Sequence, residues 1–213
     1  MPVATYDLFG QPASPATLTA DPADYTFGLQ WSATLTAGQT AVLAGIRFFS
    51  AAGAANLPDR IALFAVSGQS LIHSETASWS GAAASGWVTA LFATPPALSS
   101  GVQYKACVNR GNGGIGNWYS TTGAYWSGTG PGASGITSGP LSAPSSTGTV
   151  PLGGQGQDTF TAALALSYPL SEFNPPNYWL DVVVQVTTPA VAGGPPPGGG
   201  RSMLARHLAW ADL

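Results

Sequence analysis

Residues 178–186, with the sequence YWLDVVVQV, restrict the fold of this chain more than any other stretch. β-Branched and aromatic residues dominate them, and such residues favour a pleated, largely buried strand. Alternation gives the stretch one wholly apolar face and one mixed face. The apolar face consists of Tyr178, Leu180, Val182, Val184 and Val186. The pattern therefore predicts a central antiparallel strand, packed on a core, that closes a domain.

Upstream, short apolar stretches with a two-residue period alternate with turn signals rich in Gly, Pro and Ser. The stretches expected as strands are 25–35, 41–49, 60–66, 71–79, 87–93, 102–110 and 159–167. In 25–35 the apolar residues share one face, so its other side is expected in water. In 41–49 alternation puts Val42, Ala44, Ile46 and Phe48 on one face, opposite Leu43, Gly45, Arg47 and Phe49. The best hairpin joins 60–66 to 71–79. This spacing, without a helical period, predicts an all-β sandwich.

The composition limits the classes of function. Charged residues make up only 7% of the 213-residue chain, against about 25% in an average globular domain. The net charge of -3 gives no basic footprint for nucleic acid. A single cysteine, Cys107, excludes an intrachain disulfide. The sequence has no stretch of eighteen or more apolar residues, so no membrane span is predicted. A surface weakly charged but polar is typical of exported or virion-surface β proteins.

The first residues, MPVATYD, have neither the basic region nor the apolar region of an export signal. A surface-type β domain without such a signal is explained most simply as a phage structural protein displayed on the virion. The alternative is a piece of a longer secreted protein. We therefore expect a location on the virion surface, with an extracellular location as the alternative.

Residues 111–156 form a long glycine-rich segment, which is uncommon in a compact domain and often functional. Its aromatic residues fit a glycan platform, because sugar rings stack on aromatic faces while amides bind the hydroxyls. The candidate ligand-binding residues are Trp118, Tyr119, Tyr125, Trp126 and Asn117. The alternative is that these aromatic rings only pack the long segment onto the sandwich.

The end of the chain changes character. We expect a β-sandwich domain over residues 1–188, a Gly/Pro linker over 189–200 and a docking peptide over 201–213. A short amphipathic helix or peptide would present its apolar side to a partner. The predicted docking residues are Leu204, Leu208, Trp210 and Leu213. The alternative is a disordered end.

Several blocks resemble a domain-of-unknown-function family, number 4082, which recurs in bacterial extracellular and phage proteins beside glycan-active or adhesive modules. The matching blocks are GIRFF at 45–49, ASGWVT at 84–89, FATP at 92–95, GVQY at 101–104 and NYWLDVV at 177–183. The resemblance covers roughly residues 6–186. It implies an antiparallel jelly-roll sandwich, similar to carbohydrate-binding modules, with no catalytic residues to carry over. Ser50 departs from the family pattern, which usually has a basic residue there.

Residues suited to catalysis or metal binding are scattered. A glycosidase needs two facing carboxylates, and the acids here fall mostly in turns. Asp181 is the best candidate for a specific role, weighed against a structural carboxylate bonded to a neighbouring loop or to Arg47. Asp59 and Asp158 are weak candidates for a stabilising Ca²⁺. His73 and His207 lack metal spacing. We therefore expect no enzyme activity, no resident metal and no cofactor.

Together these features predict a non-enzymatic phage virion surface protein, either a head decoration protein or a minor tail protein. Its partners would be capsid or tail proteins, bound through the C-terminal peptide in a multimeric assembly. The displayed sandwich would bind host glycans for attachment. One alternative is a carbohydrate-binding accessory module of a secreted bacterial protein. A second is a glycan-cleaving enzyme.

Overall fold

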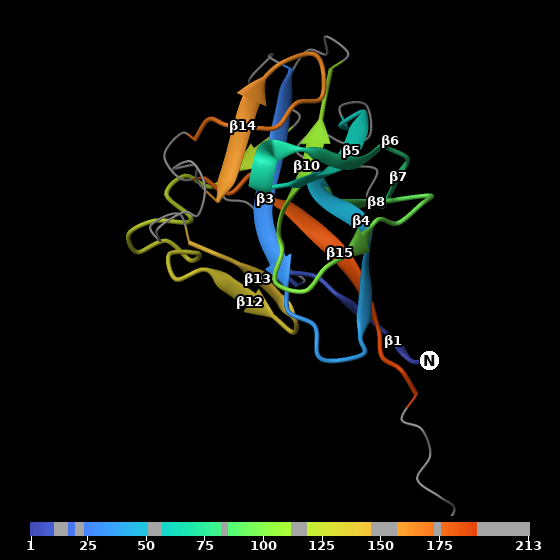
Figure 1. The fold of residues 1–213 in the computed structure, drawn as a ribbon. Helices are drawn as coiled ribbons and strands as arrows, with labels where there is room; N and C mark the ends of the chain where they lie inside the picture. The colour runs from blue at the N-terminus through green and yellow to red at the C-terminus, as the bar shows by residue number, and fades with distance from the viewer. Residues whose placement is uncertain are drawn as a thin grey trace, which may run out of the picture.

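The computed structural model describes residues 1–10, 17–19, 24–50, 57–81, 85–111, 119–145, 157–172 and 176–190. Within these ranges the chain is all-β, and two antiparallel sheets pack face to face as a sandwich (Figure 1). No helix long or apolar enough to cross a membrane occurs in this part of the chain. The predicted all-β sandwich is thus confirmed.

The first sheet has the order β1-β15-β4-β8-β7, and β9 pairs with the other end of β4. Its strands are β1 (Val3–Tyr6), β15 (Leu180–Thr187), β4 (Thr40–Ser50), β8 (Gly86–Leu91), β7 (Trp79–Gly81) and β9 (Ala97–Leu98). β1 lies at an edge, and its register pairs Val3 with Thr187. The N-terminus therefore lies beside the end of the last strand (Figure 1).

The second sheet has the order β12-β13-β3-β10-β5-β6, and β14 also pairs with β3. Its strands are β12 (Ile136–Ser138), β13 (Leu141–Ala143), β3 (Tyr25–Ala33), β10 (Gln103–Asn109), β5 (Arg60–Ala65), β6 (Leu71–Thr76) and β14 (Asp158–Ala162). A separate small sheet pairs β2 (Thr17–Thr19) with β11 (Tyr119–Thr121). The described part of the glycine-rich segment 111–156 thus contributes three strands, β11, β12 and β13.

β15 confirms the prediction of a central strand, because it pairs with β1 on one side and β4 on the other. The residues of its predicted core face from Leu180 to Val186 are buried. The strand begins two residues later than predicted. Trp179 has a backbone φ of 53°, which interrupts the extended conformation just before Leu180.

The regular alternation predicted for β4 is wrong in the first half of the strand. β15 pairs Val183 with Gly45 and Val184 with Leu43, so Ala44 is an extra residue in the ladder. Such a bulge reverses the alternation of side chains along the strand. Leu43 is therefore fully buried, whereas Val42 is only half-buried. Beyond the bulge Ile46 and Phe48 share a face, as predicted, and point into the core.

The predicted hairpin is confirmed as β5 and β6, joined by the 3₁₀ turn η2 (Ser67–Gln69), but two related predictions need correction. The predicted strand 71–79 is nevertheless divided, because β6 ends at Thr76 and Trp79 begins β7 in the other sheet. The side of β3 expected in water is also buried at Thr26, Gln30 and Ser32.

The core lies between the inner faces of the two sheets. It forms one continuous cluster of buried side chains. The large side chains that are fully buried include Phe27, Leu29 and Trp31 of β3, Leu43, Ile46 and Phe48 of β4, and Ile61 and Leu63 of β5. Burial of this apolar surface, at about 25 cal/mol per Å², is the main stabilising contribution to such a domain.

A substitution at Gly45 tests the packing between β4 and β8. A Cβ atom there would lie 2.4 Å from the carbonyl oxygen of Ala90. We expect Gly45→Ala to lower the free energy of unfolding by about 1 to 3 kcal/mol, because the two strands must separate. Urea unfolding measures the loss, with Thr5→Ala on the exposed edge strand as the control. Equal stability of the two variants would contradict this account.

Candidate functional site

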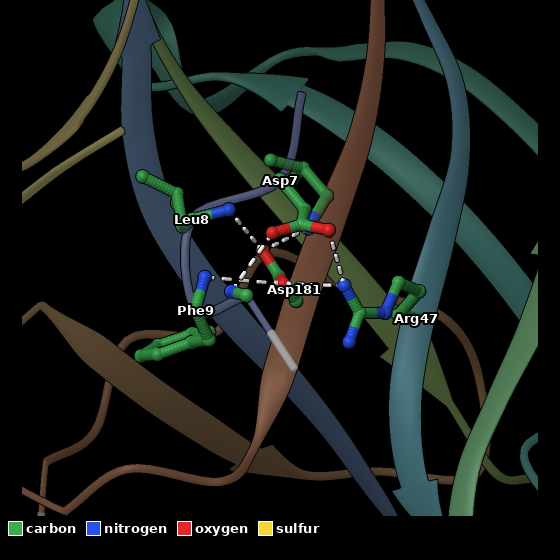
Figure 2. A network of polar contacts seen from close by, with 7 residues as sticks. Asp7, Leu8, Phe9, Arg47 and Asp181 are labelled. Atoms are coloured by element: carbon green, nitrogen blue, oxygen red, sulfur yellow. Dashed lines mark hydrogen bonds and ion pairs between the residues drawn. The ribbon is translucent and has the colours of Figure 1, made fainter. Parts of the chain in front are cut away.

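Asp181 occupies the outer face of the first sheet because its neighbours Leu180 and Val182 point into the core. Its side chain is nevertheless fully buried beneath the N-terminal segment that follows β1 (Figure 2). Oδ1 accepts the backbone N–H of Leu8 at 2.9 Å and that of Val182 at 2.7 Å. Oδ2 accepts the N–H of Phe9 at 3.3 Å. The carboxylate therefore fixes residues near the start of the chain to the last strand.

Arg47 completes this network from β4, the strand beside Asp181. Its Nη1 lies 2.6 Å from Oδ2 of Asp7 and 3.4 Å from Oδ2 of Asp181. The guanidinium also stacks over the Trp87 ring, 4.6 Å from the ring centroid. Burial raises the pKa of Asp181 to about 6, although the Leu8 N–H and Arg47 oppose that rise. The structural interpretation of this carboxylate, bonded to a neighbouring loop and to Arg47, is confirmed.

A second buried polar group lies on the outer face of the second sheet. Lys105 of β10, the only lysine in the chain, is fully buried. Its Nζ donates to Oγ1 of Thr159 at 2.7 Å and lies 5.1 Å from the centre of the Tyr168 ring. Burial lowers the pKa of Lys105 to about 8. Residues 163–170, which we call the covering segment, pass over this part of the sheet and contribute Tyr168.

Asp158, at the start of β14, has a correspondingly raised pKa. Burial raises it to about 7, opposed by the Tyr178 N–H, the Trp126 indole and Lys105. Oδ2 accepts the Tyr178 N–H at 3.0 Å. The low polarity of the site thus disfavours the charged forms of both Lys105 and Asp158. Within the described ranges no three His, Cys, Asp or Glu side chains gather as metal ligands.

The structure buries three of the five predicted platform residues. Tyr119, Tyr125 and Trp126 belong to the core cluster, and Trp126 is fully buried. The Tyr125 and Trp126 rings lie 6.2 and 6.1 Å from the Phe9 ring, both edge-on. In this conformation they anchor their segment to the sandwich, as the packing alternative describes, and offer no open face to a sugar. The other two, Trp118 and Asn117, lie outside the described residues.

The remaining predicted residues have simple placements. His73 Nε2 lies 2.8 Å from Oε1 of Glu75. Glu75 also accepts the N–H groups of Ala93 and Thr94, so this pair holds the turn after β8. The hydrogen bond from His73 lowers the pKa of Glu75. The docking residues Leu204, Leu208, Trp210 and Leu213, with His207 and most of the linker, lie outside the described residues.

A cleft of about 540 Å³ opens on the outer face of the second sheet, between the covering segment and β6. It is lined by Asp59, Arg60, Leu71, Ser74, Asn109, Gly111, Leu164, Ala165 and Leu166. The covering segment packs Leu166 and Tyr168 against Ala62, Phe64 and Cys107, over the middle of that face. The cleft is the strip of the face that this segment leaves open.

Sequence reasoning missed both the buried lysine and the cleft. In β10, Lys105 and Cys107 share the face opposite Tyr104 and Ala106. Its burial depends on the covering segment, which lies about sixty residues further along the chain and carries no local signal for this contact. The cleft likewise arises from four separate stretches of the chain, 59–60, 71–74, 109–111 and 164–166. A lone basic residue beside an acid at 59–60, in a chain so poor in charge, was the available signal.

Comparison with known sequences places the chain in a family. Residues 11–180 match the family described as Domain of unknown function (DUF4082). The chain belongs to this family. The match confirms the resemblance drawn from the sequence blocks, and the DUF4082 region spans both sheets of the sandwich. No curated protein and no solved structure matches the chain significantly.

Removal of the Asp181 carboxylate should release the N-terminal segment that follows β1. Asp181→Ala leaves the Leu8 and Phe9 N–H groups without their acceptor and leaves Arg47 partly unpaired in a buried site. We expect the free energy of unfolding to fall by about 3 to 5 kcal/mol. Denaturant unfolding measures it. Gln185→Ala, exposed on the same strand, is the control and should change stability by less than about 0.5 kcal/mol.

The pKa of Asp158 predicts a pH dependence of stability. The pKa of Asp158 is about 7 in the folded state, against an ordinary value of 3.8 in the unfolded chain. Between these pH values the folded protein therefore binds more protons than the unfolded chain. Stability therefore falls as pH rises from about 4 to about 7. Asp158→Asn should reduce this fall by at least about 1.4 kcal/mol, the equivalent of one pKa unit. Parallel stability curves for the two proteins would contradict the prediction.

Proposed function

We propose that this protein is a non-enzymatic component of a phage virion surface that displays its β-sandwich outward and binds host glycans. The observation that carries the proposal is that the buried ionisable groups hold parts of the fold together. Asp181 and Arg47 join the N-terminal segment to the first sheet, and Glu75 holds a turn. Side chains suited to acid–base chemistry thus serve the fold, which favours display and binding over catalysis.

The surface supports the same proposal. Arg47, Lys105 and Arg110 are buried, so Arg60 is the one exposed Lys or Arg in the described ranges. A surface so poor in charge recognises neutral partners through hydrogen bonds and shape rather than through long-range attraction. The passage of successive strands between the two sheets also favours the jelly-roll arrangement shared by many display and lectin domains.

The proposed tether is the C-terminal peptide, residues 201–213, which follows the Gly/Pro linker. The partner would be a capsid or tail protein in a multimeric assembly. β15 ends at Thr187, beside Val3 at the edge of the sheet, so the chain enters the linker from one end of the sandwich. A linker leaving from that end lets the sandwich project from a particle.

Truncation after Pro189 tests the tether in the assembled particle. We expect the full-length protein in purified virions and at least a tenfold smaller amount of the truncated protein, measured by quantitative mass spectrometry. Equal unfolding temperatures of the two proteins provide the control for folding. Incorporation of the truncated protein at the full-length amount would exclude the peptide as the anchor, and absence of both from virions would exclude the virion role.

The glycan-binding part of the proposal also fits a carbohydrate-binding module of a secreted bacterial protein, and the virion measurement separates the two contexts. A glycan-cleaving enzyme is the competing class. Hydrolysis of cell-wall glycans by the purified chain would overturn the non-enzymatic proposal. Because Trp126 is buried, its substitution tests folding, and the aromatic platform is better tested at Trp118.

A further inference from the structure

The cleft on the second sheet has a rigid polar end. Asp59 is held on both sides, since its backbone N–H donates to the Asn109 carbonyl at 2.8 Å and its carbonyl accepts the Ala77 N–H at 2.8 Å. Its Oδ2 accepts the Gly111 N–H at 3.0 Å. Asn109 is held in turn by Oγ1 of Thr26, at 3.0 Å. These polar groups therefore keep their positions whether or not a ligand is present.

Arg60 and Ser74 supply hydrogen-bonding groups that no other described residue uses. Neither side chain has a hydrogen bond or ion pair with another described residue, whereas the other described Arg and Lys side chains are buried. The guanidinium only donates, the Asp59 carboxylate only accepts, and the hydroxyl does both. The cleft thus presents donors and acceptors together, with opposite charges on neighbouring residues 59 and 60.

The long sides of the cleft are apolar. Leu71 of β6 is 51% exposed and Leu164 of the covering segment is 66% exposed, and both line the cleft. Leu166 lies deeper, against the small cluster on the sheet. The Leu164 carbonyl oxygen packs so closely against Gly111 that a Cβ atom would not fit there. Exposed leucines on a preformed wall gain free energy when a ligand covers them.

We propose that this cleft is a binding site for a neutral mono- or disaccharide, with Arg60 as its main hydrogen-bond donor. The inference rests on the proposed glycan-binding function and assigns it a location. Sugar hydroxyls both donate and accept, which suits Arg60, Asp59 and Ser74 together, and the C–H face of a sugar ring suits the leucines. The volume of about 540 Å³ lies within the range of about 300 to 1,000 Å³ of small-molecule sites.

Other ligand classes fit the cleft less well. A phosphate or acidic sugar would meet the Asp59 carboxylate beside Arg60, without a second exposed cation among the described residues. A purely apolar ligand would offer no acceptor to the Arg60 guanidinium. A bound peptide strand would use backbone groups of a sheet edge, whereas this cleft presents the side chains of Asp59, Arg60 and Ser74.

The test uses the full-length protein and a panel of glucose, galactose, rhamnose, N-acetylglucosamine and their disaccharides, with glucuronic acid as the acidic comparison. Ligand-observed NMR and calorimetry give the affinity. We expect Arg60→Ala to weaken binding about tenfold or more and Arg60→Lys to weaken it less, because a charged donor remains. Leu164→Ala should weaken it about threefold. Leu91→Ala is the matched control, since Leu91 is 62% exposed on the other sheet.

The outcomes separate this inference from the function on which it rests. Arg60→Ala and Leu164→Ala could both bind saccharide as the wild type does and have the same unfolding temperature. That result would overturn the cleft as the binding site but leave glycan binding elsewhere on the protein. Binding of glucuronic acid alone would overturn the neutral ligand class. No binding of any saccharide would overturn both the cleft and the glycan-binding proposal, and leave the virion measurement to decide the display role.

Discussion

The carboxylate of Asp181 is the interaction on which the arrangement of this domain depends. It receives backbone N–H groups from Leu8 and Phe9 and lies beside the Arg47 guanidinium. A charge in so buried a position is costly unless it is fully bonded. The covering of the outer face of the first sheet therefore depends on this one side chain. That dependence explains why an acid interrupts the most apolar strand of the sequence.

The sequence predicted the sandwich because each long strand carries its own alternation. Prediction failed where a residue's environment comes from another part of the chain. The bulge at Ala44 exists only in relation to β15, and the division of 71–79 between two sheets has no local pattern. From the sequence alone, Lys105 is expected to be an exposed strand residue. It is buried because residues 163–170 cover it. The cleft could not be predicted, because the residues that form it lie on four separate stretches of the chain.

The two faces of the sandwich therefore have different roles. On the first sheet, buried ionisable groups hold the N-terminal segment in place. On the second sheet, the covering segment seals the middle of the outer face and leaves open a strip with fixed polar groups at one end. Preorganised polar groups reduce the entropy lost when a ligand binds. This division places the proposed recognition site on the sheet that does not receive the chain ends.

The placement of β15 between β1 and β4 also has a mechanical consequence. The chain continues beyond Thr187 in the direction of this strand, so a pulling force from that side acts along its axis. The hydrogen bonds to both neighbours lie across that axis. They are therefore loaded in shear and resist together instead of breaking one after another. A domain held from this end and gripped at its far side would withstand tension better than one held through an edge strand.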